Sequence, residues 1–183
     1  MKLSTNFLKE YVDVDVDTKT LAEAMTKAGS EYDSAENLVE ATNLVIGEIK
    51  ECKEHPDSDH LHLCKVDVGN EILDIVCGAP NARAGIKVIV ALPGAELPGG
   101  VKIKTGKLRG VESCGMMCSV GELGLDLADY TGQIDHGIMI LDKELEKEIG
   151  KDVVEILNLK EDIIDFEITP NRPDCLSIEG LGR

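Results

Sequence analysis

Histidine and cysteine side chains suited to metal binding gather in one short stretch with the pattern H-x4-H-x-H-x-C. On a strand, His62 and Cys64 would share one face, as two zinc ligands must. No second pair of ligands follows at a matching spacing, and ordinary alternation would leave His60 and His62 at the surface. We therefore expect no metal here. The stretch contains His55, His60, His62 and Cys64.

Cys118 and His136 form the other pair that could do chemistry, as a thiol nucleophile and its base. No residue is placed to orient the imidazole, and no glycine-rich oxyanion segment lies beside the thiol. The sequence also lacks the GxxxxGK[ST] and GxGxxG loops that bind phosphate groups of nucleotides. We therefore predict no catalytic residue and expect Cys118 to be a buried free thiol.

The charge distribution indicates a different chemistry, which is contact with phosphate. Between residues 83 and 109 six basic residues accompany one acid, Glu96, so the local charge is six minus one, or +5. Residues 110–167 hold 15 acids and 4 lysines, or −11. A basic ribbon in an acidic chain suits selective RNA contact, although charge alone fits a solubilising hairpin equally well. The ribbon comprises Arg83, Lys87, Lys102, Lys104, Lys107 and Arg109.

The central part of this ribbon alternates in polarity. A strand there would place Val101 and Ile103 on one face and Lys102 and Lys104 on the other. Every aromatic residue lies outside the ribbon, so we expect recognition of RNA backbone and shape rather than stacking on bases. The aromatic residues are Phe7, Tyr11, Tyr32, Tyr130 and Phe166.

The elements that position these residues are predicted from apolar spacing and turn residues. One helix is expected at 4–11, capped by Ser4, and a second from Thr18, with Gly29 ending it. The second helix has an apolar stripe of Leu21, Ala24, Met25 and Ala28. Between them, alternating Val and Asp at 12–17 suggest a brief extended segment.

A change to strand patterns follows at about residue 43. Several short strands with frequent turns indicate a small β-barrel. After residue 142 the chain becomes acidic and helical, with Asp152 as a cap, before an extended run at 163–169. The expected strands are 43–49, 61–68, 72–77, 86–92 and 137–141.

The fold class expected is therefore α+β, with the barrel inserted between two flanks that pack together as a small α/β domain. Each flank is too short to bury a core alone. The expected limits are 1–40, 41–149 and 150–183. Ser177 caps a final helix that has about one turn before the sequence stops, so we expect a fragment of a longer protein.

Composition narrows the class of protein. The 183 residues are 43% hydrophobic but only 3% aromatic, so the core must be aliphatic. The net charge of −16 means that RNA binding needs a local basic patch. No signal peptide or apolar run of membrane-spanning length is present. Six cysteines without CxxC spacing are expected to be reduced thiols in a cytoplasmic protein.

Several motifs together carry a family resemblance. Residues 55–61, HPDSDHL, resemble the HP-x-[AS]-D-[RK]-L element of the tRNA-binding OB-fold, and matches at 76–81, 107–113, 115–119 and 122–125 follow in family order. Both flanks resemble the β chain of bacterial-type phenylalanyl-tRNA synthetases. The matching flank segments are MKLSTNFLKEYV at 1–12 and ITPNRPDCLS at 168–177.

This resemblance implies a five-stranded OB-fold barrel and a tRNA-binding, scaffolding role in the N-terminal region of the β subunit. It adds Ser119 to the nucleic-acid-binding candidates of the ribbon. It also implies that the full enzyme is an α2β2 heterotetramer, with the α subunit as partner, and that it attaches phenylalanine to tRNA using ATP and magnesium. No cofactor is expected in this chain. The alternative is a purely structural module with little tRNA contact, which the acidic net charge favours.

Overall fold

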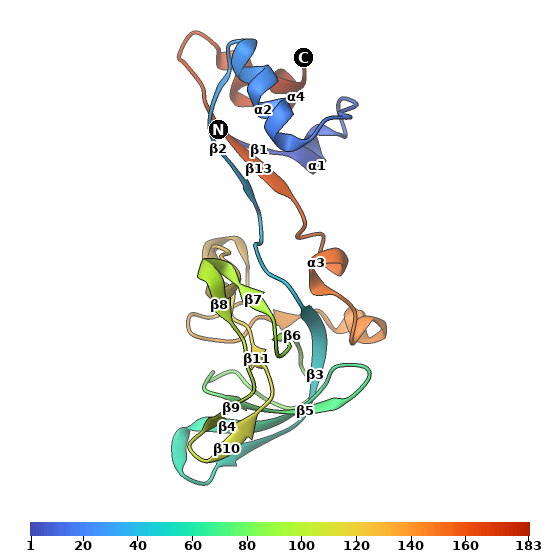
Figure 1. Ribbon diagram of the computed structural model, residues 1–183, viewed down its shortest axis with the longest axis vertical. Helices are drawn as coiled ribbons and strands as arrows, with labels where there is room; N and C mark the ends of the chain where they lie inside the picture. The colour runs from blue at the N-terminus through green and yellow to red at the C-terminus, as the bar shows by residue number, and fades with distance from the viewer. The chain divides into compact units, whose positions relative to one another are not determined.

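The computed structural model describes residues 1–183 and divides them into two compact units. The flanking unit combines Met1–Leu38 with Lys160–Arg183, and the inserted unit is Val39–Leu159 (Figure 1). The chain is a mixture of helices and strands with mostly strand content. No helix has the length and apolar character needed to cross a membrane.

The flanking unit is a three-stranded antiparallel sheet with short helices. The sheet order is β1-β13-β2, so a strand from the C-terminal flank lies between two strands from the N-terminal flank. Leu3, Leu8, Ala22, Ile164 and Phe166 form its core. The elements are β1 (Lys2–Ser4), α1 (Thr5–Leu8), α2 (Thr18–Lys27), β2 (Glu31–Asn37), β13 (Asp162–Glu167), η5 (Pro173–Leu176) and α4 (Ile178–Gly182).

The cap of α2 and its buried face differ from the prediction. Asp17, rather than Thr18, is the N-cap, and its carboxylate accepts a hydrogen bond from the amide of Thr20 at 3.0 Å. Ala22 is fully buried, whereas the predicted stripe residues Ala24 and Ala28 are exposed. Only Leu21 and Met25 of that stripe pack on the core. Residues 12–17 form no strand, so the alternation of Val and Asp was misleading.

The inserted unit is built on a six-stranded antiparallel sheet. Its order is β11-β6-β3-β4-β5, and β12 also pairs with β6. Its core is aliphatic and includes Ile49, Val66, Ile75, Val88 and Val90. The strands are β3 (Leu44–His55), β4 (Ser58–Asp67), β5 (Ile72–Cys77), β6 (Lys87–Ala91), β11 (Met116–Met117) and β12 (Ile140–Leu141).

The sheet curls so that β5 approaches the segment that precedes β11. The amide of Cys114 donates to the carbonyl of Asp74 at 2.8 Å, and the amide of Val76 donates to the Ser113 hydroxyl at 3.1 Å. These bonds join the two ends of the sheet at single points. No strand ladder links the ends, so the sheet is not a barrel closed by continuous pairing.

Two small hairpins and several short helices complete the inserted unit. β7 (Glu96–Leu97) pairs with β8 (Val101–Lys102), and β9 (Gly106–Leu108) pairs with β10 (Val111–Ser113). The short helices are η1 (Pro98–Gly100), η2 (Gly121–Leu123), η3 (Leu127–Asp129), η4 (Lys143–Glu148) and α3 (Val153–Ile156).

The inserted unit extends past the boundary expected at residue 149. The amide of Gly150 donates to the carbonyl of Ile46 at 2.8 Å, and the Ile46 amide donates to Lys151 at 3.0 Å. Asp152 caps α3 through its carboxylate, and Val153 is fully buried. The segment around α3 therefore completes one edge of β3 rather than starting the next unit.

Candidate nucleic-acid interface

Four of the predicted cations lie on consecutive elements of the inserted unit and are exposed. Lys102 is on β8, Lys104 follows it, Lys107 is on β9, and Arg109 is in the turn after β9. We call these four residues the basic segment. Lys102 lies 3.8 Å from the carboxylate of Glu96, a surface pair that holds the ammonium only weakly.

The strand predicted through Val101 and Ile103 is shorter than expected. β8 ends at Lys102, and the two apolar residues do not share a face, since Val101 is 54% exposed and Ile103 is 8% exposed. The Ile103 amide donates to the Ala95 carbonyl at 2.9 Å, and the Gly94 amide donates back to Ile103 at 2.8 Å. Buried Ile103 therefore anchors a segment that carries a lysine on each side.

Arg109 has an unusual backbone conformation, and its side chain makes a long-range hydrogen bond. Its φ of 46° lies in the left-handed region. Its guanidinium donates to the carbonyl of Asp57 at 3.0 Å, which ties the β9–β10 turn to the turn between β3 and β4. The HPDSDHL motif at 55–61 and the family motif at 107–113 thus meet in space.

The other two ribbon residues are set apart from the basic segment. Lys87 is only 7% exposed because it lies within β6, opposite Glu48 on β3 and Leu141 on β12. A lysine covered in this way is poorly placed to neutralise a phosphate. Arg83 is exposed, and its guanidinium donates to the nearby carbonyl of Asn81 at 3.3 Å.

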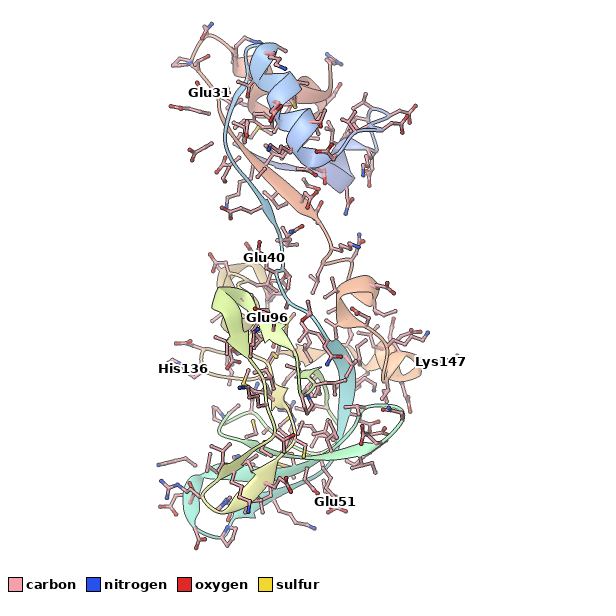
Figure 2. All side chains as sticks on the ribbon, viewed as in Figure 1. Glu31, Glu40, Glu51, Glu96, His136 and Lys147 are labelled. Carbon is pink, nitrogen blue, oxygen red and sulfur yellow. The ribbon has the colours of Figure 1, made fainter.

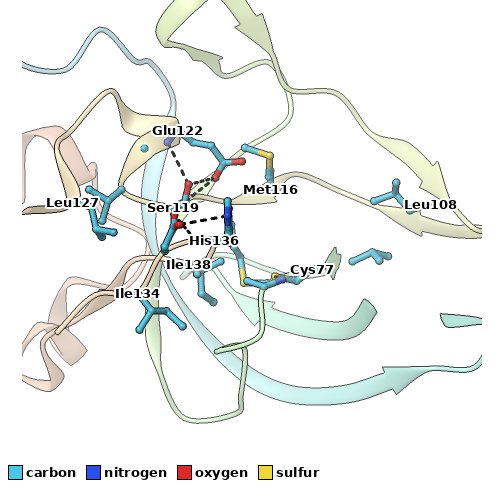
Figure 3. Close-up of a pocket in the computed structure, with 17 residues that line it drawn as sticks. Cys77, Leu108, Met116, Ser119, Glu122, Leu127, Ile134, His136 and Ile138 are labelled. Carbon is cyan, nitrogen blue, oxygen red and sulfur yellow. Dashed lines mark hydrogen bonds and ion pairs between the residues drawn. The ribbon is translucent and has the colours of Figure 1, made fainter. Parts of the chain in front are cut away.

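Ser119 lines a cavity of about 650 Å³ whose walls are largely apolar (Figure 3). Its hydroxyl and its amide both donate to one carboxylate oxygen of Glu122, each at 2.7 Å. The Glu122 amide donates back to the Ser119 hydroxyl at 3.3 Å. This reciprocal S-x-x-E arrangement resembles a capping box, a spacing that is readable in the sequence but that the sequence analysis missed.

Two amide side chains hold the chain beside this cavity. Asn81 donates to the carbonyl of Ile138 at 2.8 Å and accepts from its amide at 2.9 Å. Gln133 does the same for Ile140, with both distances 2.9 Å. These clamps fix the segment that leads into β12, and with it the cavity wall that contains His136.

Comparison with known proteins adds to this geometry. Residues 44–152 match a family model described as "Putative tRNA binding domain", and these residues contain the basic segment and the cavity. The chain belongs to this tRNA-binding domain family.

Two relatives that match nearly the whole chain carry the same name. The chain is 48% identical to the phenylalanine–tRNA ligase β subunit of Clostridium acetobutylicum, covering 100% of this chain and 23% of that protein. It is 46% identical to the same subunit of Streptococcus pneumoniae, over 99% of this chain and 22% of that protein. It thus spans about a fifth of these relatives' length. A solved MetRS-related protein from Pyrococcus horikoshii matches 60% of this chain and 87% of its own, with 24% identity and a TM-score of 0.43.

Within the tRNA-binding domain, Cys118 and His136 do not form a nucleophile pair. Cys118 is fully buried, and burial, with a smaller effect from the Glu122 carboxylate, raises the pKa of its thiol to about 12. The side chain of His136 is 90% exposed and lies 3.4 Å from the Asp135 carboxylate. The cysteine therefore stays a neutral thiol near neutral pH.

The histidine and cysteine cluster occupies the β3–β4–β5 part of the domain. His62 and Cys64 lie on β4, and across the ladder Cys64 faces Cys52 while His62 faces Cys77. The sulfur atoms of Cys52 and Cys64 are 3.7 Å apart. No group of three or more such side chains has the arrangement of a metal site. His62 is half-buried with an unpaired Nδ1, so it does not stand at the surface as the alternation suggested.

Proposed function

We propose that this tRNA-binding domain is part of a phenylalanine–tRNA ligase β subunit and that it binds the tRNA backbone through the basic segment. One observation carries the proposal, which is that four exposed cations lie on consecutive elements between residues 102 and 109, within the residues that match the family model. The remaining surface is acidic, since the net charge is −16, so the segment is the part of the domain that attracts phosphate.

The enzyme as a whole is proposed from the names of the relatives. We infer that the full protein joins an α subunit in an α2β2 heterotetramer in the cytoplasm and attaches phenylalanine to tRNA, using ATP and magnesium. This chain supplies tRNA binding and scaffolding to that assembly. We infer that the chemistry belongs elsewhere in the enzyme, since Cys118, the candidate nucleophile of this chain, is a buried thiol with a raised pKa.

We also infer that the inserted unit is a five-stranded barrel of the OB type, with its RNA-binding part within residues 41–149. The sheet order β11-β6-β3-β4-β5 and the bonds from Cys114 and Val76 across its ends support this assignment. In the OB-fold, oligonucleotides bind to the face of two neighbouring strands and to the loops that connect strands.

A salt titration with charge-reversal variants tests the binding proposal. Neutralising four phosphates should give a log–log salt slope of about −2 to −3 for binding of bulk tRNA, from roughly −0.7 per phosphate. K102E/K104E should weaken binding at least tenfold and flatten the slope, whatever the tRNA sequence. Folding should be retained, because surface substitutions usually change stability by within about 0.5 kcal/mol.

K143E/K147E is the matched control, since it makes the same charge change on exposed residues of η4. Lys147 lies on the opposite side of the inserted unit from His136, a residue that lines the cavity (Figure 2). The control should bind tRNA nearly as wild type does. Equal binding by wild type and K102E/K104E, at low and moderate salt, would show that the segment only solubilises the domain. The structural-module alternative would then hold.

A further inference from the structure

We propose that the cavity beside Ser119 receives one unpaired guanine base of the bound RNA and that the Glu122 carboxylate selects it. This inference rests on the proposed function and goes beyond it, because backbone contact alone carries no preference for a base. It assigns a base-reading site to a domain whose cations only position the RNA.

The walls of the cavity suit the faces of a flat base. Its volume of about 650 Å³ lies within the range of ligand pockets, and Met116, Leu108 and Ile134 line it. A thioether makes favourable contacts with aromatic rings, and flipped bases are commonly held between apolar side chains. Leu108 is 48% exposed and Ile134 is 46% exposed, so a bound base would cover apolar surface that now faces water.

The cavity also lies next to the cations. Leu108 belongs to its lining, and the two residues on either side of Leu108 in the sequence are Lys107 and Arg109. Arg109 is held in place by its bond to Asp57. These two residues therefore place positive charge on the chain immediately beside the part of the cavity wall that Leu108 forms.

Among the polar groups that line the cavity, which include Asp135 and His136, the Glu122 carboxylate is an acceptor with spare capacity (Figure 3). Ser119 occupies only Oε2 of Glu122, and the carboxylate is exposed, so Oε1 remains available. A carboxylate only accepts hydrogen bonds. Guanine presents two adjacent donors, N1–H and N2–H2, on its Watson–Crick edge. Uracil presents a single N3–H donor between two carbonyl oxygens, which the carboxylate repels, while adenine and cytosine each offer one amino donor beside an acceptor.

Short single-stranded RNAs test this inference directly. Four oligouridines that differ only in a central guanine, adenine, cytosine or uridine would be titrated by fluorescence anisotropy at one salt concentration. Wild-type protein should bind the guanine RNA about tenfold more tightly than the uridine RNA, the selectivity of one good two-bond contact. E122Q keeps an acceptor for Ser119 but presents an amide donor, so its guanine-to-uridine ratio should fall close to one.

E146Q is the control, because it removes one exposed, unpaired carboxylate from η4 and should keep the wild-type ratio. L108A is a second test that leaves Glu122 intact, and it should also lower the ratio. Equal binding of all four RNAs by wild type, or an unchanged ratio in E122Q, would overturn the guanine site and leave the backbone proposal standing. If wild-type protein bound neither tRNA nor any of the four oligonucleotides, the proposed function and the guanine site would both be overturned.

Discussion

Three thiols of the tRNA-binding domain are kept neutral by their surroundings. Burial raises the pKa of Cys64, and the facing Cys52 thiol adds to the effect. Burial likewise raises the pKa of Cys77 and brings that of Cys118 to about 12. A thiol needs ionisation to react, so these side chains behave as apolar core residues rather than nucleophiles.

Alkylation at controlled pH tests this account. With a pKa of about 12, only about one Cys118 thiol in 10⁴ is ionised at pH 8. Iodoacetamide at that pH should therefore modify half-buried Cys114 in the native protein well before Cys118, as read by peptide mass spectrometry. In urea the two should react alike. Equal rates in the native protein would contradict the burial of Cys118.

The raised pKa values of these thiols also determine the direction in which stability changes with pH. The pKa of a thiol is about 9 in the unfolded chain and about 12 for Cys118 in the folded protein. As the pH rises, the thiol therefore ionises in the unfolded chain before it does so in the folded protein. The stabilisation is complete below about pH 9 and is lost as the pH rises from about 9 to 12. The urea midpoint should therefore fall over this range. C118A, which removes one such thiol, should show a shallower fall.

At the scale of elements, β3 is the central strand that pairs with both β4 and β6, and at Gly47 it has no room for a side chain. Gly47 on β3 lies opposite Val88 on β6. A Cβ at this position would lie 2.6 Å from the Cγ2 of Val90 and 2.9 Å from the Cγ1 of Val66. Only glycine leaves room at this position for the side chains of Val66 on β4 and Val90 on β6.

We therefore expect G47A to destabilise the domain by about 1–3 kcal/mol through overpacking, measured by urea unfolding. G106A is the matched control, since an added Cβ there meets nothing within 4 Å. Its cost should stay within about 0.5 kcal/mol. If G47A and G106A were equally stable, the side chains of Val66 and Val90 would move aside at little cost, and the close packing at Gly47 would be unimportant.

Prediction from sequence located some elements that their own residues mark but missed an element that depends on a distant partner. The expected strand at 72–77 coincides with β5, and the Asp152 cap of α3 is as expected. β2, Glu31–Asn37, was missed because its sequence EYDSAEN is polar, and it forms only because β13 supplies a partner. Local patterns do not contain such long-range pairing.

For the site, the charge count found the basic segment but could not separate buried Lys87 from exposed Lys102. Both lysines have Val and Ile as their sequence neighbours, and it is the neighbouring strands that cover Lys87. Asn81 is 57 positions from its partner Ile138 in the sequence, and Gln133 is 7 positions from its partner Ile140. The cavity they support was therefore invisible to motif spacing.

At the scale of the whole molecule, the two units differ in how they depend on chain continuity. The flanking unit needs β13 to pair with both β1 and β2, so neither flank can complete its sheet alone. The inserted unit is continuous in sequence and has its own core. Folding of the inserted unit should therefore be separable from that of the flanking unit.

Excised pieces of the chain test this independence. Residues 39–159 alone should fold cooperatively and bind tRNA with the salt slope of the longer chain, because the piece retains the core and the basic segment. A shorter piece, 41–149, loses Val153, which is fully buried, together with the hydrogen bond from the Gly150 amide to Ile46 and the one from the Ile46 amide to Lys151. Loss of a buried side chain should lower its stability by roughly 1–3 kcal/mol, seen as a lower thermal midpoint by circular dichroism. If the two pieces melted together, the α3 segment would be peripheral, and the inserted unit would end before it.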